Sequence, residues 1–361
     1  MLSSGSGSIQ REEVHAYRLP IISKIYRFAI LYVYTQIIFR KKPMNYWQTD
    51  FSIGNIKVPR FISGPLDGYT DSPFRQLTRH YSPSALLYSE MRHVASVSHD
   101  SGAKKALKFE NFEKPFSFQT SANSTDFIEE AVERLLAYGI TSVDLNVGCP
   151  ARAVVASGAG SELMANMETL EKIVKLFRKL LPIPFTVKMR AGFKKKNALE
   201  VARMLSDNGV DALAIHPRLQ SAKFSGALDY DLVAQIKKEI SIPLIFSGEV
   251  RTIDDARMVY DRTGVDGFMI GRGMQGQPWK LKQLQTEALG QEFKISQQEI
   301  ITCALKHLDL LTKHYGDHGL FNFRKHIPFY IHDFEEAAGI RKELMVVESY
   351  GQLTESLNQL I

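Results

Sequence analysis

The chain of 361 residues contains two cysteines, Cys149 and Cys303, and their separation limits the chemistry that sulfur can carry out. Two thiols far apart in the sequence cannot build a disulfide scaffold or a self-contained zinc site, and no metal site is expected. Cys149, in the stretch DLNVGCPARAVVASGAG, is therefore either an inert packing residue or a reactive thiol. Cys303 fits a buried position in a helix.

Other residue types suit a phosphorylated cofactor. FSGEV and IGRG place Gly248 and Gly271 where backbone N–H groups can approach an anion, and Arg272 adds a permanent cation. If the phosphate belongs to a flavin, the amide of Gln119 could bind the pyrimidine edge of the ring. Lys188 could then stabilise negative charge near N1 and O2. The alternative is that Gln119 and Lys188 are solvated strand ends.

These residues follow short apolar runs that recur along the chain and predict buried strands. Amphipathic stretches such as TDFIEEAVERLLAYG separate the runs, and several end on Gly, as helices commonly do. Eight strand-helix units favour an α/β fold of the (β/α)8 type, a TIM barrel, with a doubly wound sheet as the alternative. The eight predicted strands are residues 61–64, 85–90, 116–120, 142–146, 185–190, 212–216, 243–247 and 267–271.

A barrel makes a prediction about where polar side chains lie. Catalytic groups of such barrels sit on the face where the strands end, and the loops after the seventh and eighth strands commonly bind phosphate. We therefore expect one site on one face of the barrel. The polar residues at these strand ends are Asp67, Glu90, Gln119, Asn146, Cys149, Lys188, Arg190, His216, Ser247, Gly248, Glu249, Gly271 and Arg272.

Charge is spread unevenly along the chain. The formal net charge is +6, but residues 1–43 carry +5 of it, so the rest of the chain is close to neutral. A nucleic-acid surface must then be a local patch rather than a field over the whole protein. Runs such as KKK could also be plain solvated surface. Basic residues gather in the loops after the fourth to sixth predicted strands: Arg152, Arg190, Lys194, Lys195, Lys196, Arg218 and Lys223.

Residues 1–43 differ from the rest of the sequence. A Ser/Gly-rich start is followed by an apolar run of 12 residues, 28–39, between basic residues. A helix of that length covers roughly 18 Å, whereas the hydrocarbon core is about 30 Å thick, so no transmembrane span is expected. The segment is interpreted as a disordered extension, a weak interfacial anchor, or a mis-annotated start with translation from Met44.

Seven motifs resemble, in order, those of the flavin-dependent tRNA-dihydrouridine synthases: SGPLDGYTDSPFR, FSFQT, VDLNVGCPA with SGAGSELM, FTVKMRAGF, LAIHPR with KFSGALDY, IPLIFSGEV and GFMIGRGMQGQPW. The resemblance implies an FMN-binding TIM barrel over residues 44–290. It also implies a helical tRNA-binding domain over residues 291–361, matched mainly through FRKHIPFYI. We expect a cytoplasmic enzyme that acts on tRNA and needs no stable protein partner.

The reaction that the resemblance implies is reduction of the uridine C5–C6 bond to 5,6-dihydrouridine. Hydride passes from N5 of reduced FMN to C6, the thiol of Cys149 protonates C5, and NADPH or NADH reduces the flavin again. By motif, the resemblance places Pro65, Leu66 and Asp67 along the flavin, Gln119 and Lys188 at its ring, His216 near the flavin and the substrate base, and Ser247, Gly248, Glu249, Gly271 and Arg272 at the phosphate. The residues that we predict to contact tRNA, from their positions at the strand ends and in the tail, are Asn146, Arg152, Arg190, Arg218, Lys223, Arg324 and Lys325, with His326 beside the last two.

Three motifs depart from the family pattern, because PLDG, HPR and SGE stand where PMAG, HGR and NGD are usual. Asp67 and Pro217 are thereby placed near the flavin and the substrate, which bears on rate and on the choice of uridine. Two other functions stay open from the sequence. One is an FMN-dependent reductase of a free pyrimidine, and the other is a tRNA-binding protein without turnover. The helical tail favours tRNA over a free pyrimidine.

Overall fold

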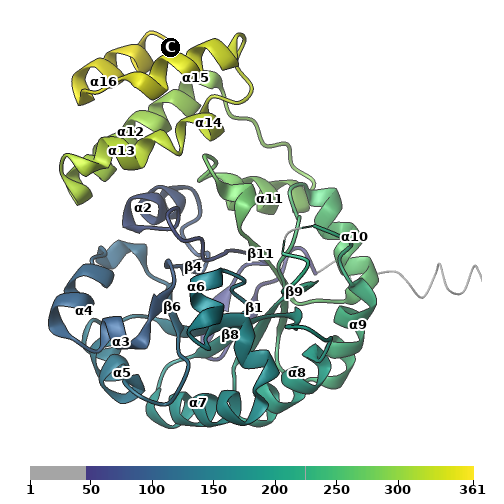
Figure 1. Cartoon of the computed structure of the whole chain (residues 1–361). Helices are drawn as coiled ribbons and strands as arrows, with labels where there is room; N and C mark the ends of the chain where they lie inside the picture. Colours follow the sequence, from purple (N-terminus) through teal and green to yellow (C-terminus); the bar gives the residue numbers. More distant parts are fainter. Residues whose placement is uncertain (1–45, 224) are drawn as a thin grey trace, which may run out of the picture. The chain divides into compact units, whose positions relative to one another are not determined.

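Figure 1 shows the computed structural model, which describes residues 46–223 and 225–361. The extension of residues 1–43, with its apolar run, lies outside the described residues. Within the described ranges, none of the helices has both the length and the apolar character needed to cross a bilayer.

Eight parallel strands form the centre of the fold; from β4 to β11 each barrel strand pairs with the next barrel strand along the chain, and the last pairs with the first, β3. This unbroken order rules out the doubly wound sheet, whose strand order reverses at a switch point, and confirms the predicted barrel. All eight predicted strands are present: β3 (Phe61–Ser63), β4 (Leu87–Tyr88), β6 (Phe116–Ser121), β7 (Ser142–Val147), β8 (Phe185–Gly192), β9 (Ala212–Leu219), β10 (Leu244–Phe246) and β11 (Gly267–Ile270). A short strand, β5 (Arg92–His93), adds to the end of β6.

The barrel closes between its first and second strands, where the regular ladder is interrupted. The backbone N–H of Ser63 donates to the carbonyl of Leu86 at 3.1 Å. The hydroxyl of Ser63 accepts from the N–H of Tyr88 at 2.8 Å. Two hydrogen bonds therefore join β3 to the segment of β4, and the sheet is left nearly continuous around the barrel.

Helices follow the strands and cover the barrel from outside, as Figure 1 shows. Their apolar faces point inward: in α7 the buried residues are Leu170, Ile173, Val174 and Phe177, which recur at helical spacing. The helices of this layer are α2 (Ser72–Tyr81), α3 (Val94–Val97), α4 (Asp100–Ala106), α5 (Ile128–Ala137), α7 (Met167–Leu180), α8 (Ala198–Asp207), α9 (Tyr230–Glu239), α10 (Ile253–Thr263) and α11 (Lys280–Ala288). The short α6 (Arg152–Ala156) buries none of its residues and lies inside this ring of helices in Figure 1.

A hairpin of two antiparallel strands, β1 (Phe51–Ile53) and β2 (Ile56–Val58), precedes the barrel and was not predicted from the sequence. Ile53 and Val58 are fully buried in one core cluster with barrel residues, among them Tyr88. Gly54 at the turn, with a φ of 55°, lies so close to Pro184 that a Cβ atom would come within 3.0 Å of its side chain. Because Pro184 directly precedes β8, the hairpin covers the amino ends of the strands.

Five helices make up the C-terminal region, which confirms the predicted helical tail. Its core contains Cys303, as expected for a buried helix position, and extends to Leu77 of α2 and to Trp279. The tail therefore shares its core with the outer layer of the barrel. The helices are α12 (Gln297–Tyr315), α13 (His318–Arg324), α14 (Ile327–Tyr330), α15 (Ala337–Val346) and α16 (Tyr350–Asn358).

Candidate active site

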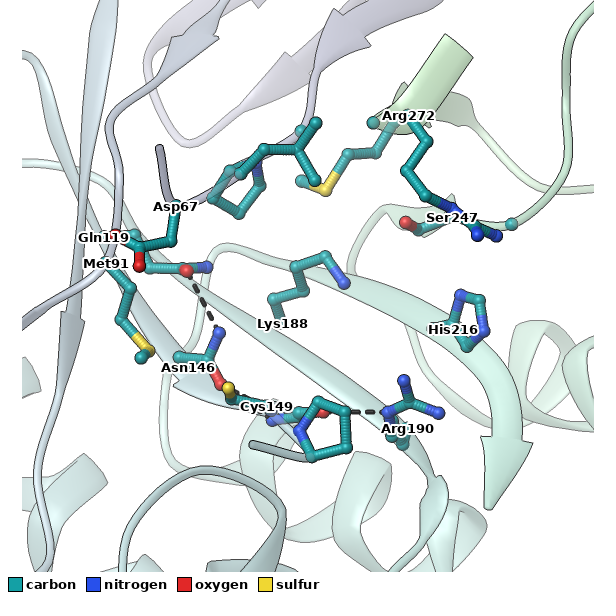
Figure 2. Close-up of a pocket in the computed structure, with 18 of the residues that line it drawn as sticks. Asp67, Met91, Gln119, Asn146, Cys149, Lys188, Arg190, His216, Ser247 and Arg272 are labelled. Carbon is teal, nitrogen blue, oxygen red and sulfur yellow. Dashed lines mark hydrogen bonds between the residues drawn. The ribbon is translucent and has the colours of Figure 1, made fainter. Parts of the chain in front are cut away.

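A cavity of about 290 Å³ opens at the carboxyl ends of the strands. It brings together all the residues that the sequence assigned to a flavin, together with Cys149, Asn146 and Arg190. Figure 2 shows Gln119 and Asn146 on one side of it, His216 and Ser247 on the other, and Lys188 between them. The assigned residues that line it are Pro65, Leu66, Asp67, Gln119, Lys188, His216, Ser247, Gly248, Glu249, Gly271 and Arg272.

Strand register explains why residues far apart in the sequence meet here. Asn146 of β7 is paired with Lys188 of β8, and Arg190 of β8 is paired with His216 of β9. Successive side chains of a strand alternate between its two faces, so Lys188 and Arg190 lie on the same face. Three neighbouring strands thereby bring an amide, two cations and an imidazole to the same cavity.

The turn that carries Cys149 is held at several points. Asn146 Oδ1 accepts hydrogen bonds from the backbone N–H groups of Gly148, at 3.0 Å, and Cys149, at 2.8 Å. The hydroxyl of Ser161 donates to the carbonyl of Cys149 at 2.9 Å. Gly160, with a φ of 62°, packs so closely that a Cβ atom would lie 3.0 Å from that same carbonyl. The half-buried thiol therefore has a fixed backbone beneath it.

Asp144 is a buried acid beneath the cavity that the sequence reasoning did not single out. Its carboxylate accepts from Gln119 Nε2 at 2.7 Å and from the Thr186 hydroxyl at 2.5 Å. Burial raises the pKa of Asp144 to about 7, while these two hydrogen bonds and the charge of Lys188 act in the opposite direction. The sequence does not indicate this role, because in a sequence a buried acid within a strand cannot be distinguished from any other polar residue of a strand.

Lys188 and His216 each have a side-chain nitrogen that makes no hydrogen bond with another described residue. Burial, with the nearby charge of Arg190, lowers the pKa of Lys188 to about 8. Burial and the charges of Lys188, Arg190 and Arg218 lower the pKa of His216 to about 2, so its imidazole is neutral. Among the described residues, neither Lys188 Nζ nor the buried His216 Nε2 has a hydrogen-bond partner.

The carboxylate of Asp67, the departure in PLDG, lies at the rim of the cavity, and its side chain is 79% exposed. Arg92 bridges Asp67, at 3.2 Å, and Glu90, at 2.7 Å. Glu90 in turn accepts from the backbone N–H of Gly68 at 2.6 Å. This ion-pair network ties the loop after β3 to the loop after β4.

The loops after β10 and β11 carry the residues predicted for phosphate. Gly248 has a φ of 155°, and a Cβ atom there would lie 3.4 Å from His216 Nδ1 and 3.1 Å from Leu228. Glu249 has a φ of 52° although it is not glycine, and its carboxylate pairs with Arg218 at 2.7 Å. Arg272 begins a short 3-10 helix, Arg272–Met274, directly after β11.

Three basic side chains predicted to contact RNA are buried, which corrects the expectation of a surface role. Arg190 donates to the carbonyls of Gly148 and Lys223, at 2.8 Å each. Arg218 donates to the carbonyl of Gly226 at 2.8 Å and to Glu249. His326 is fully buried between the barrel and the tail. Sequence alone does not reveal such carbonyl partners, so buried and surface cations look alike in it.

Of the residues predicted for RNA, Asn146 lines the cavity, and the remaining basic ones do not. Arg152 and Lys223 are exposed, as are Lys194, Lys195 and Lys196. Arg324 and Lys325 are half-buried. Arg324 donates to the carbonyl of Val347 at 2.9 Å, and Lys325 Nζ lies 5.6 Å from the ring centre of Tyr69.

Apolar and backbone positions of the cavity were missed by sequence reasoning. Met91 follows β4, and Met269 lies on β11. A methionine in a sequence is usually interpreted as a packing residue. Only its position directly after a strand could have identified Met91 as part of the cavity. The remaining unpredicted lining residues are Gly64, Gly148, Pro150, Val250, Arg251 and Gly273.

Comparison with known proteins gives matches over most of the chain. A family model described as dihydrouridine synthase (Dus) matches residues 61–361. The "Probable tRNA-dihydrouridine synthase 1" of Synechocystis sp. is 33% identical over 320 residues, covering 87% of this chain and 90% of that protein. The "tRNA-dihydrouridine synthase B" of Vibrio cholerae is 30% identical over 313 residues, covering 84% of this chain and 97% of that protein. Among solved structures, histamine dehydrogenase from Rhizobium sp. 4-9 has a TM-score of 0.53 at 12% identity, covering 74% of this chain and 51% of that chain, a likeness of fold.

Proposed function

This chain belongs to the dihydrouridine synthase family, and from that membership we propose that it reduces specific uridines in tRNA to 5,6-dihydrouridine. One observation carries the proposal. A single cavity brings the thiol of Cys149 together with two nitrogens, Lys188 Nζ and His216 Nε2, that have no hydrogen-bond partner among the described residues. A thiol beside such nitrogens suits a site that donates a proton to one ligand and binds another.

FMN fits the residues that line this cavity. Lys188 Nζ is free to face the electron-rich edge of the ring, and the neutral His216 can share a hydrogen bond through Nε2. Gln119 would bind the pyrimidine edge, and Pro65, Leu66 and Asp67 would lie along the ring. The phosphate would be held by Ser247, Gly248, Glu249, Gly271 and Arg272, which line the same cavity. When bound and reduced by NADPH or NADH, FMN supplies the hydride that uridine C6 accepts.

Cys149 is the residue that we assign to proton donation at uridine C5. Its backbone is fixed at the N–H by Asn146 and at the carbonyl by Ser161, so the thiol is presented to the cavity from a rigid turn. A positioned acid of this kind typically contributes a factor of about 10² to 10⁴ in rate. The neutral imidazole of His216 does not compete as an acid at neutral pH, because its pKa is lowered to about 2.

Four cations outside the cavity, two of them exposed and two half-buried, would bind the tRNA backbone. Arg152 begins α6 after β7, Lys223 lies in the loop after β9, and Arg324 and Lys325 belong to the tail. Neutralising phosphates with such side chains makes binding weaken as salt concentration rises. In this proposal residues 44–290 bind FMN, residues 291–361 orient the tRNA, and the enzyme works in the cytoplasm without a stable protein partner.

The first prediction concerns Cys149. We expect Cys149→Ala to slow dihydrouridine formation by a factor of about 100 or more, because the general acid is lost. Cys303→Ala is the matched control, since Cys303 lies in the core of the tail, and its rate should stay within about twofold of the native rate. The measurement is dihydrouridine in an unmodified tRNA transcript incubated with the purified protein, FMN and NADPH, read by mass spectrometry.

Each alternative function gives its own result in the same assay. Reduction of free uridine or uracil, with tRNA left unchanged, would identify the reductase of a free pyrimidine. Binding of the transcript with no reduction by the native protein would identify a tRNA-binding protein without turnover. An unaffected rate in Cys149→Ala would remove Cys149 from the reaction.

A further inference from the structure

We propose that Asp144 is a positioning residue, which fixes the turn of Cys149 by orienting the amides of Gln119 and Asn146. The inference rests on the proposed function for the role given to Cys149, but the positioning itself concerns the protein alone. Asp144 does not line the cavity, so it acts through the residues above it.

A continuous row of hydrogen bonds connects the acid to the thiol residue. Gln119 Nε2 donates to Asp144 Oδ2 at 2.7 Å, and Asn146 Nδ2 donates to Gln119 Oε1 at 3.0 Å. Asn146 Oδ1 then accepts from the backbone N–H of Cys149 at 2.8 Å. Figure 2 shows Gln119, Asn146 and Cys149 in this order along one wall of the cavity. Asp144, Gln119 and Asn146 are all buried, so water does not easily replace these partners.

The direction of every hydrogen bond in the row follows from the acid at its foot. Above its pKa of about 7 the carboxylate of Asp144 is mostly ionised and only accepts, so Gln119 must turn its NH2 group towards Asp144 and its oxygen away from it. Asn146 must then turn its own NH2 group towards that oxygen, which leaves Asn146 Oδ1 facing the turn. The N–H groups of Gly148 and Cys149 require an acceptor at that place. If Gln119 flipped, its NH2 group would face the NH2 group of Asn146. A flip of Asn146 would relieve that contact but would remove the acceptor for the turn.

The same row defines what a ligand meets at Gln119. One N–H and one lone pair of its amide are engaged within the protein, and one of each remains for the cavity. Because Asp144 fixes the positions of the NH2 group and the oxygen of the Gln119 amide, the pattern of donor and acceptor is set before any ligand binds. Preorganised groups of this kind lose no free energy to reorientation when the ligand binds.

The test measures the reactivity of the Cys149 thiol in the full chain without added FMN or tRNA. Iodoacetamide alkylation at pH 8 is followed by mass spectrometry of the peptide that contains Cys149. We expect Asp144→Ala to raise the alkylation rate at least about threefold, because loss of the acceptor frees Gln119 and loosens the turn. Asn146→Ala should raise it in the same way. In the double variant the rate should equal that of Asn146→Ala, because both residues act through one row.

Thr120→Val is the matched control, since the buried Thr120 hydroxyl donates to the backbone carbonyl of Asp144 at 3.1 Å and takes no part in the hydrogen bonds of the row. Its alkylation rate should stay within about 1.5-fold of the native rate. If Asp144→Ala does not fold, the nearly isosteric Asp144→Asn takes its place, and a smaller rise is expected. A rate for the Asp144 variant equal to that of Thr120→Val would overturn the proposal. The proposal would also be overturned if the increases in alkylation rate caused by the Asp144 and Asn146 substitutions multiplied in the double variant.

This readout separates the two proposals. If the native protein forms no dihydrouridine, the proposed function fails, and the alkylation rates still decide whether Asp144 orients the turn. If dihydrouridine forms and the alkylation rates do not respond to Asp144, the function stands and the positioning role fails. A second readout is the visible spectrum of FMN added to the variants, which should shift in Asp144→Ala and not in Thr120→Val.

Discussion

Lys188 holds its ammonium group half-buried next to a second cation, Arg190, and this position lowers its pKa to about 8. The group is therefore mostly charged at pH 7 and mostly neutral at pH 9. If Lys188 faces negative charge on the flavin, FMN should bind about tenfold more weakly at pH 9 than at pH 7, since only the charged form attracts it. The measurement is the FMN dissociation constant as a function of pH.

Lys188→Arg is the control for this pH dependence. A guanidinium stays charged throughout the range, so the dissociation constant of that variant should change little between pH 7 and pH 9. Lys188→Ala should bind weakly at both values. A native profile as flat as that of Lys188→Arg would mean that the ammonium group does not contact the flavin.

At the level of residues, the sequence located most of the cavity because strand ends can be read from apolar runs. Cys149, Gln119 and Lys188 each follow or end such a run, and the structure places all three in one cavity. Asp144 was not identified, because its role depends on which face of β7 points inward and on its partner across the strand. Arg218 was placed at the surface because charge in a sequence does not show a buried carbonyl partner.

At the level of elements, two histidines are packed where the tail meets α2. The ring centres of His307 and His326 lie 4.4 Å apart, and the ring of His326 stacks on that of Phe74. Burial, with the charge of Lys325, lowers the pKa of His326 to about 3. Burial also lowers the pKa of His307 well below its ordinary value, with further lowering by His326 and Lys325. Both imidazoles are therefore neutral in the folded protein at neutral pH.

The pair predicts a loss of stability in mild acid. The unfolded chain takes up a proton on each histidine near pH 6.5, whereas the folded chain does so only at a much lower pH. Stability contributed by the neutral rings is therefore full above pH 6.5 and falls as the pH drops below it. His326 should cost about 2 kcal/mol between pH 7.5 and pH 5, and His307 should add a loss of the same sign, measured as the free energy of unfolding in urea.

His326→Phe is the informative variant for this pair. Both ring nitrogens of His326 are buried and have no hydrogen-bond partner among the described residues, so a phenyl ring can take the place of the imidazole. The variant should lose about 2 kcal/mol less than the native protein over the same pH interval. An equal loss in both proteins would mean that His326 is already protonated or solvated at pH 5.

The barrel strands were predicted from the sequence, but the β1–β2 hairpin was not. The reasons are the length of the strands and the elements next to them. Helical patterns separate the eight barrel strands from one another, so the repeat identifies even β10, which has three residues. The β1–β2 hairpin lacks that repeat, and its strands of three residues each carry too few positions for a pattern. Ile53 and Val58 are buried because the amino end of the barrel covers them, which only the folded barrel provides.

At the level of the whole molecule, the tail and the barrel are not separate bodies in the described part of the chain. Leu77 of α2 and Trp279 belong to the same core as Leu308 and Phe323 of the tail. Across this contact Tyr315 donates to Asp71 at 3.2 Å, and Lys108 donates to the carbonyl of His314 at 2.8 Å. A tail fixed in this way would present tRNA to the barrel at a set angle.

The hairpin at the amino end of the barrel limits the route by which ligands can enter. Because β1 and β2 fill the amino end, anything that reaches the centre must come through the mouth at the carboxyl end. If the proposed function is correct, the nicotinamide and the uridine would both approach the flavin through that mouth. They would therefore have to bind one after the other. Initial rates measured at several tRNA concentrations should then give parallel lines in double-reciprocal plots against NADPH. Intersecting lines would mean that both can be bound at once.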